Sequence, residues 1–500
     1  MAETAVIPQK GQLKRKFGMR EAVTIAAGSV IGVGLFTTGS NVVGDLGPLV
    51  IFATLLALAV SIYPSLLYAE MGAELPYAGG TYQFASVGIG RWAGVLAGWS
   101  FIISLVSVTG GEALAFSYYF KTIFLAVGIT LPISDASLAA LMVAGFTLVN
   151  VFGVEVSGRV QNAAMFFFWG VALIWFLTMV PNVSLPTFVT TPDFISNTTP
   201  LTFFAAMCMI WWCFAGFESA VSMSEEIKYP HINVPRAMFL TPFVVFAVNA
   251  LFQWFLVGIT PLDSMSMLSD ADAPFAEAMI SAGIMGFPLI LLCIGIAFGG
   301  DFSTLNASVA TTGRYLFVMA RDGAVPKFFA RTSKRFSTPY IAVLTLGTLS
   351  IILILTNSLD YIANLSLFAD LFYYVIGIIA ALCLRERFPQ MKRAYKAPGI
   401  RVGAPVSAII YVLMMTQLEP DAFTTGVIWC ILALVVYAIC RKVYGVQGEF
   451  TLDLAASGAD DEPDAEERAK MDREYRIWKI VVGIACVVAV VLFAFPYLVV

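Results

Sequence analysis

The chain has 500 residues and a formal net charge of −4; 59% of its residues are hydrophobic and 12% are charged. Its mean hydropathy of +0.84 excludes an ordinary soluble globule. Uncharged apolar runs of about 20 residues, the length that crosses roughly 30 Å of hydrocarbon, recur along the chain. The sequence therefore predicts an all-α polytopic membrane protein.

Thirteen apolar ranges predict membrane-spanning helices. They are residues 22–43, 46–70, 93–125, 133–152, 160–181, 201–222, 239–260, 284–316, 339–357, 361–384, 402–418, 423–441 and 480–500. With the N-terminus inside, every one of the 29 Lys and Arg residues except Lys121 falls in a cytoplasmic segment. Because cytoplasmic loops carry an excess of Lys and Arg, the sequence predicts this orientation in the cytoplasmic (plasma) membrane.

The first predicted span contains glycines in a place where a membrane helix would be expected to continue. Its stretch GSVIGVGLF, residues 28–36, places three glycines in an apolar run. Glycine costs about 1 kcal/mol against alanine in a helix interior and leaves the backbone open to other partners. The stretch predicts a break at residues 32–34, and close helix packing through small residues is the alternative.

The sixth predicted span holds a second interruption. Its stretch WWCFAGFESA, residues 211–220, has Gly216 in the middle and Glu218 shortly after. Transporters commonly pair interrupted helices from two inverted repeats, and five spans separate the two breaks, which predicts a five-plus-five inverted repeat. Half-helix ends present free N–H groups and carbonyls, which can bind a carboxylate and an ammonium group or cation.

Four carboxyl groups within predicted spans stand out, and they are Glu112, Glu218, Asp301 and Asp370. Such groups cost at least about 2.5 kcal/mol each at mid-membrane, so they are functional candidates. Glu218 is interpreted as a proton carrier or as a structural carboxylate that fixes the break through backbone N–H groups. Glu112 suits a cationic side chain or amine, or it faces outside water or pairs with Lys121. Asp370 is assigned to packing or an outer vestibule.

Several long motifs resemble those of the amino acid–polyamine–organocation permeases. They are GSVIGVGLF, residues 68–99, residues 214–238, ARDGAVPKFF at 320–329 and AYKAPG at 394–399. The resemblance covers the chain from about residue 15 to residue 445. It implies a leucine-transporter-like five-plus-five inverted repeat with broken helices 1 and 6, a midplane substrate site between these helices, and alternating access.

The resemblance also implies the residues of a substrate site. The substrate carboxylate is expected at Ser29, Ile31, Gly32, Val33 and Gly34, and its amino group at the backbone of Phe214, Ala215 and Gly216. Trp212 aligns with an aromatic residue that closes over substrate in the arginine/agmatine antiporter branch. Glu112 falls where related arginine transporters contact the distal substrate side chain, on a pocket-facing stripe with Ser104, Leu105 and Thr109.

Coupling residues follow from the same resemblance. Glu218 aligns with the proton-sensing carboxylate of that branch and is the favoured proton carrier, with Asp301 as the second candidate. Ser303 and Thr304 match hydroxyl positions of a sodium site, so Asp301, Ser303 and Thr304 could hold Na⁺; a hydrogen-bonded helix break is the alternative interpretation of Asp301. Phe168 occupies the position at which some proton-coupled relatives carry a lysine.

The domain organisation follows from the spans and the charge pattern. The expected parts are a cytoplasmic N-terminal segment (1–20), a first inverted repeat (21–200), a second inverted repeat (201–400), two further spans (401–445), an acidic cytoplasmic linker (446–476) and an extra C-terminal transmembrane helix (477–500). The linker is expected to be disordered or to lie on the surface because it is too polar to bury apolar area.

Together these features predict a secondary active transporter that moves a small amino acid by alternating access, driven by a proton gradient, with Na⁺ as an open alternative. The alternatives are a polyamine or ethanolamine-type permease, an amino acid/amine exchanger, and a nutrient sensor that signals through the acidic linker. The sequence contains no catalytic constellation, P-loop or zinc motif, so we expect no enzyme activity, resident cofactor or nucleic-acid partner. The expected partners are an amino acid or amine and the lipid bilayer, and a homo-oligomer stays open.

Overall fold

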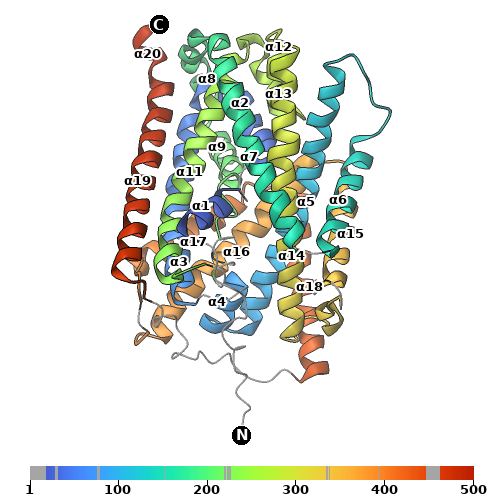
Figure 1. Cartoon of the computed structure of the whole chain (residues 1–500), viewed down its shortest axis with the longest axis vertical. Coiled ribbons are helices and arrows are strands. Elements are labelled where there is room, and N and C mark those ends of the chain that lie inside the picture. Colours follow the sequence, from blue (N-terminus) through green and yellow to red (C-terminus); the bar gives the residue numbers. More distant parts are fainter. Residues whose placement is uncertain are drawn as a thin grey trace.

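The computed structural model describes residues 18–28, 32–75, 79–152, 154–218, 221, 224, 227–333, 336, 338–391, 393–445 and 462–500, without the side chains of residues 24–28, 154–162 and 310. In these ranges the structure is built from helices, and most of the long ones run along the same axis of the molecule (Figure 1). The short helices α4, α8 and α12 lie near the ends of this bundle.

The first part of the chain forms α1 (Met19–Gly28), the π-helix η1 (Gly34–Thr38), α2 (Gly39–Leu46), η2 (Gly47–Leu49), α3 (Val50–Glu74), α4 (Gly80–Gly88), α5 (Arg91–Leu125), α6 (Asp135–Phe152), α7 (Val154–Met179), η3 (Val180–Asn182), η4 (Leu185–Thr190) and α8 (Thr191–Asn197). The second part forms α9 (Pro200–Trp212), α11 (Pro230–Ile259), η6 (Leu262–Asp270), α12 (Pro274–Ser281), α13 (Phe287–Gly295), the π-helix η7 (Ile296–Asp301), α14 (Phe302–Arg321), η8 (Lys327–Ala330), α15 (Tyr340–Ile354), α16 (Leu359–Arg387), α17 (Ile400–Met415), α18 (Pro420–Tyr444), α19 (Ala465–Ala494) and α20 (Pro496–Val499).

Nine helical segments among the described residues are long and apolar enough to cross a membrane, and α9, α15 and α17 are shorter apolar helices. Every one of the thirteen ranges that the sequence predicts as spans contains helix. Three of these ranges depart from an α-helix in their interior. The first and sixth are interrupted near the predicted breaks, and the eighth range, 284–316, passes through the π-helix η7, which the sequence analysis did not predict.

The acidic segment 446–476 is predicted to be a disordered or surface linker, and its described part lies at the surface but is largely helical. Residues 446–461 lie outside the described residues, but α19 already begins at Ala465 and runs on into the apolar C-terminal stretch. Asp464 caps this helix by accepting a hydrogen bond from the Glu467 N–H at 2.8 Å, and Glu466 and Glu467 lie in its first turn. Acidic residues stabilise a helix N-terminus, so the composition that suggested a linker instead starts a helix.

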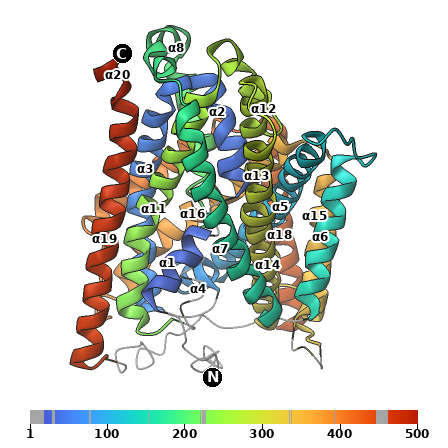
Figure 2. The ribbon, with the colours of Figure 1, turned by 45° about the horizontal axis from the view of Figure 1, so that its top comes forward.

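Helix α19 lies along α11 at the edge of the bundle in both Figure 1 and Figure 2. At one end Arg236 of α11 forms an ion pair with Asp472 of α19. At the other end the Trp254 indole N–H donates to the Leu492 carbonyl at 2.9 Å. Contacts at both ends and along the length attach the extra helix to the rest of the protein.

A buried ion-pair network joins the C-terminal ends of α3 and α16. Glu70 pairs with Arg385 and, at 3.3 Å, with Arg393, and its carboxylate also accepts the Ala397 N–H at 2.7 Å. Arg393 lies 3.1 Å from the Glu74 carboxylate. Because a buried charge is tolerated only when it is paired, these contacts fix the segment after α16 against α3.

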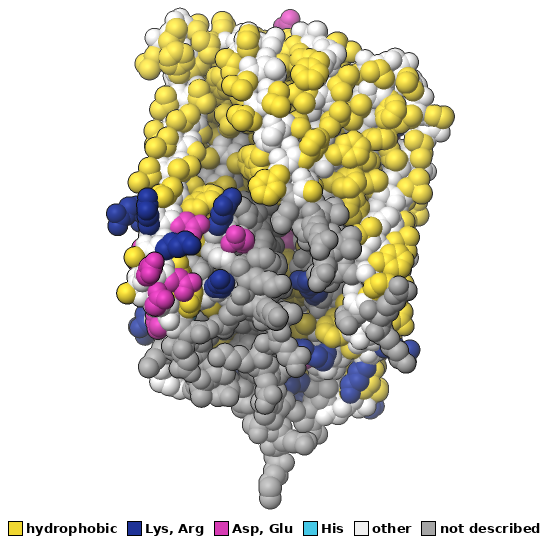
Figure 3. Space-filling view, viewed as in Figure 1, with side chains coloured by type: hydrophobic (Ala, Val, Ile, Leu, Met, Phe, Trp, Pro, Cys, Tyr) yellow, Lys and Arg dark blue, Asp and Glu magenta, His cyan; other side chains and the backbone are white. Residues whose placement is uncertain are grey.

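The side chains on the outer surface divide by type. Apolar side chains cover most of the upper part of the face seen in Figure 3, whereas the described Lys, Arg, Asp and Glu residues on this face gather mainly toward the end of the bundle where the N-terminus lies. Exposed apolar residues such as Leu141, Leu173 and Val487 are 60–64% exposed. Such a belt is stable next to lipid and not next to water.

Candidate functional site: two helix breaks and four buried carboxyl groups

The first helix break lies between α1 and η1. Ser29 and Ile31, two of the predicted substrate residues, lie outside the described residues. Beyond them the Gly32 carbonyl accepts hydrogen bonds from the N–H groups of Leu35 at 2.9 Å and Phe36 at 3.1 Å. The chain then enters the π-helix η1 at Gly34. Gly32, one of the predicted glycines, lies in a bend and not in a helix.

The second break follows α9, which ends at Trp212. Turns cover residues 213–218, and Gly216 has φ = +107°, a backbone conformation that favours glycine. The Gly216 N–H donates to the Tyr374 hydroxyl at 3.1 Å, and the same hydroxyl donates to the Glu218 carboxylate. Tyr374 of α16 therefore holds both the turn and the carboxyl group that follows it.

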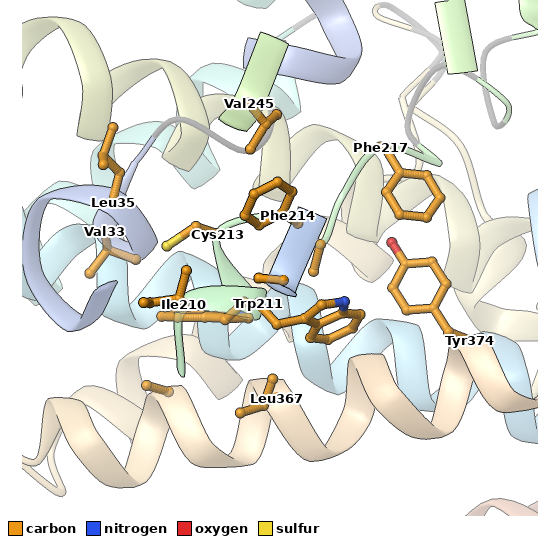
Figure 4. Close-up of a cluster of buried hydrophobic side chains, with 14 of the residues drawn as sticks. Val33, Leu35, Ile210, Trp211, Cys213, Phe214, Phe217, Val245, Leu367 and Tyr374 are labelled. Carbon is orange, nitrogen blue, oxygen red and sulfur yellow. The ribbon is translucent and has the colours of Figure 1, made fainter. Parts of the chain in front are cut away.

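The two breaks lie against each other. The Cys213 thiol contacts the Gly34 carbonyl with a sulfur–oxygen distance of 2.9 Å. A Cβ atom on Gly34 would lie 3.6 Å from the Cys213 Cα, so the two backbones run in van der Waals contact. Figure 4 shows Val33 and Leu35 beside Cys213 and, further along, Phe214, above α16. The predicted pairing of the first and sixth spans is thus present in the geometry.

Glu112 of α5 reaches the first break. Its Oε1 accepts the Val33 N–H at 2.9 Å, and a Cβ atom on Gly32 would overlap its carboxyl group. The side chain is only 2% exposed, and Lys121 pairs with Asp135 at 2.9 Å instead. The alternative interpretation of Glu112, a carboxylate in outside water or paired with Lys121, is therefore wrong.

Asp301 terminates the π-helix η7 and is fully buried. Its carboxyl group interacts with that of Glu112, which is buried beside it. Neither carboxyl oxygen of Asp301 has a hydrogen-bond partner in the described part of the chain. A π-helical turn inserts an extra residue and often occurs at functional sites; here it directs Asp301 toward Glu112 and the first break.

The three residues considered with Asp301 for ion coupling differ in where they point. Ser303 and Thr304 both donate to the Gly300 carbonyl of their own helix, at 2.8 and 3.4 Å. Phe168 packs edge-on against Phe36, with a ring-centroid distance of 5.5 Å, and its backbone lies against Gly299 of η7. The surroundings of Asp301 on the α7 side are therefore apolar at this position.

Helix α16 carries three polar residues that the site prediction did not include: Ser366, Asp370 and Tyr374. They are spaced by four residues and therefore share one helical face. The Trp212 indole N–H donates to the Ser366 hydroxyl at 3.1 Å, and the Ser104 hydroxyl donates to the Asp370 carboxylate at 2.5 Å. Polar residues repeated every four positions in an apolar span are a pattern from which this polar face of α16 could have been predicted.

The predicted α5 stripe is divided between two places. Ser104 joins the α16 residues, since its hydroxyl lies 3.3 Å from that of Ser366, whereas Leu105 is half-buried in the apolar packing. Thr109 bonds to the Ser308 hydroxyl of α14 at 2.8 Å and lines a small cavity of about 10 Å³ with residues of α14 and α15. Thr109 therefore binds α14, Glu112 contacts the first break, and Ser104 contacts α16.

The two tryptophans of the sixth span also differ. Trp212 contacts the α16 residues, and Trp211 packs against Tyr374 and Tyr411 with ring-centroid distances of 5.7 and 4.9 Å. Trp212 therefore meets the α5–α16 polar residues, while Trp211 packs among aromatic rings.

The electrostatic character of this region is strongly acidic. Among the described residues, none of Glu112, Glu218, Asp301 and Asp370 forms an ion pair with Lys, Arg or His. Nor do the described His, Cys, Asp and Glu residues form a group of three that could hold a metal ion. Four buried carboxyl groups without basic partners require protons or a positively charged ligand.

Comparison with known proteins identifies the family. Residues 17–440 match the family described as "Amino acid permease". The branched-chain amino acid permease of Bacillus subtilis is 24% identical over 86% of this chain and 94% of its own. The methylthioribose transporter of the same organism is 23% identical over 87% of this chain and 95% of its own. The human cystine/glutamate transporter is 24% identical over 84% of this chain and 83% of its own.

The match covers both helix breaks and all four buried carboxyl groups, and it confirms the resemblance to the amino acid–polyamine–organocation permeases. It also identifies a transporter and not an enzyme. The chain belongs to the amino acid permease family and is a multi-pass membrane protein that transports amino acids.

Proposed function

We propose that the protein is a proton-coupled amino acid transporter of the plasma membrane that works by alternating access on a leucine-transporter-like five-plus-five inverted repeat. The single observation that carries this proposal is the contact between the two helix breaks, with the paired carboxyl groups of Glu112 and Asp301 beside the first break. The gathering of Lys and Arg near the N-terminal end supports an orientation with that end in the cytoplasm.

Substrate recognition is assigned to the backbone groups of the two breaks. In the first break, N–H groups and a positive helix end suit the carboxylate of an amino acid; in the second, the carbonyls of residues 213–215 suit its ammonium group. The names of the branched-chain amino acid permease and the cystine/glutamate transporter specify different amino acids as substrates. Membership of the family therefore does not identify the side chain of the amino acid that this protein transports.

Proton coupling is assigned to Glu112 and Asp301. Two neighbouring carboxylates that are buried away from water repel each other strongly, so we infer that the pair holds at least one proton. Glu112 also binds the Val33 N–H, and a change in its charge therefore alters a hydrogen bond in the first break. In this scheme proton release to the cytoplasm and rearrangement of the substrate site are one event. Na⁺ is the competing cation, because the hydroxyl oxygens of Ser303 and Thr304 keep lone pairs for a cation while they donate to the Gly300 carbonyl.

Glu218, the carboxyl group favoured as proton carrier by the sequence, receives a different role here. Its carboxylate accepts a hydrogen bond from Tyr374, which in turn accepts the Gly216 N–H. Tyr374 thus links Glu218 to the turn at Gly216, and we assign Glu218 to holding the second break. This corresponds to the structural alternative named for that residue in the sequence analysis.

The test is uptake into proteoliposomes under an inward proton gradient. A panel of amino acids and their decarboxylated amines is offered to the purified protein with and without the gradient, and with Na⁺ present or absent. We expect uptake of at least one amino acid, accelerated by the gradient and independent of Na⁺. Transport of amines in preference to amino acids would instead support the amine-permease alternative.

The coupling residues are tested in the same assay. Glu112→Gln and Asp301→Asn should each lose the acceleration by the proton gradient, because a neutral amide can neither take up nor release the proton. Glu419→Gln, on an exposed residue before α18, is the matched control and should respond as the wild type does. Gradient-driven uptake by both amide variants would remove the pair from the coupling mechanism.

A further inference from the structure

Asp370 is a buried carboxyl group that the coupling scheme does not use. It lies on α16 between Ser366 and Tyr374, one helical turn from each. Ser366 binds Trp212, the last residue before the second break, and Tyr374 binds Gly216 within that break. Asp370 therefore lies on α16 opposite the turn whose carbonyls, in the proposed function, receive the ammonium group of the substrate.

The hydrogen bonds of Asp370 all come from neutral groups. Ser104 donates to it at 2.5 Å, and Ser366 and Trp212 also interact with its side chain. A carboxylate offers about four acceptor positions, so the hydrogen bond from Ser104 leaves capacity for a further donor. No Lys, Arg or His in the described part of the chain forms an ion pair with it, although the residue is only 4% exposed.

Glu112 is less suited than Asp370 to bind a charged part of the substrate. The Glu112 carboxyl already binds the Val33 N–H and contacts Asp301. It therefore lies at the first break, where the substrate carboxylate is expected, and a second negative group there would repel that carboxylate unless it is protonated. Asp370 faces the second break, where a positive group is expected, and its charge has no other partner.

We propose that Asp370 is a substrate-binding residue whose carboxylate pairs with a positively charged nitrogen of the transported amino acid, held in place by Ser104 and Ser366. This inference rests on the proposed function, because it places the substrate at the second break. The nitrogen is either the α-ammonium group or a cationic side-chain end, and both share the chemistry of a buried ion pair stabilised by hydrogen bonds.

The experiment measures discrimination by charge in the Asp370→Asn variant. The best amino acid substrate from the uptake panel is compared with its α-hydroxy acid, which replaces the ammonium group by a neutral hydroxyl. If the best substrate is lysine or arginine, it is also compared with norleucine or citrulline, which keep the ammonium group but lose the side-chain charge. Inhibition constants against uptake of the radiolabelled substrate report the affinity of each compound.

In the wild type we expect the compound that retains the charged nitrogen paired with Asp370 to bind at least tenfold more tightly than its neutral counterpart. In Asp370→Asn this ratio should fall to below threefold. If the affinity ratio between the amino acid and its α-hydroxy acid is lost in the variant, the α-ammonium group is the partner of Asp370. If the affinity ratio between lysine and norleucine, or between arginine and citrulline, is lost, the charged side chain is the partner. A ratio that is unchanged in Asp370→Asn, or absent in the wild type, overturns the proposal.

Two further variants keep the test decisive. Asp370→Ser removes the charge by a second route and should lose the discrimination even if Asp370→Asn does not fold, whereas Asp370→Glu retains the charge and should keep it. Asp360→Asn, at the exposed start of the same helix, is the matched control. A wild type that carries no amino acid at all refutes the proposed function itself, which distinguishes that failure from failure of the Asp370 proposal.

Discussion

Substitution of Gly32 by alanine tests the contact between Glu112 and the first break. A Cβ atom on Gly32 would overlap the carboxyl group of Glu112, so the glutamate must move and give up its 2.9 Å hydrogen bond to the Val33 N–H. A hydrogen bond involving a charged group contributes about 1.5–3 kcal/mol. Because about 1.4 kcal/mol corresponds to a tenfold change in rate, Gly32→Ala should slow uptake about 10- to 150-fold.

The assay is the initial rate of uptake into proteoliposomes at matched protein density, together with the unfolding temperature in detergent. Gly110→Ala is the control, because a Cβ atom there meets its nearest neighbour at 3.6 Å, an ordinary contact. Shortening the acid in the double variant Gly32→Ala/Glu112→Asp makes room for the new methyl group and should recover part of the rate. A Gly32→Ala protein that transports as fast as the wild type would refute the proposed role of this contact.

Three further predictions follow from other contacts. Tyr374→Phe removes the hydroxyl that donates a hydrogen bond to Glu218, and this hydrogen bond contributes about 1–3 kcal/mol. The rate of uptake should therefore fall at least about fivefold, and an unchanged rate would show that the contact with Glu218 is not needed for transport. Arg393→Met leaves Glu74 without its ion-pair partner in a buried network, which should lower the free energy of unfolding by about 3–5 kcal/mol. The variant should unfold at a lower temperature, and a thermal unfolding curve unchanged from the wild type would contradict this prediction. A chain ending at residue 445 loses α19, so it should unfold at a lower temperature yet retain uptake, whereas loss of uptake in a still-folded protein would favour the sensor alternative.

The positions of the helix breaks could be predicted from the sequence because their cause is local. Glycines in GSVIGVGLF and at Gly216 weaken a helix wherever they occur, and a left-handed φ of +107° at Gly216 is a conformation that other residues rarely adopt. The buried carboxyl groups could be found for the same reason, since charge in an apolar span is conspicuous without any knowledge of its neighbours. The predicted spans likewise needed only length and composition.

The partners of those carboxyl groups could not be predicted, because they lie on helices far apart in the chain. Nothing local to Glu112 or Asp301 shows that they touch, and the π-helical turn that brings them together has no clear sequence signal. The assignment of Asp370 to packing or an outer vestibule missed its contact with Ser104 for the same reason. The acidic residues at the start of α19 were interpreted from composition alone, but at the N-terminus of a helix they stabilise that helix.

The central claim, that amino acid transport is coupled to protons through Glu112 and Asp301, is tested most directly by recording internal pH in proteoliposomes that contain a pH-sensitive dye. On adding the transported amino acid outside, without Na⁺, the account predicts acidification of the interior by the wild-type protein and none by Asp301→Asn. Uptake of the amino acid that requires Na⁺, or that proceeds in the wild type with no change in internal pH, would contradict it.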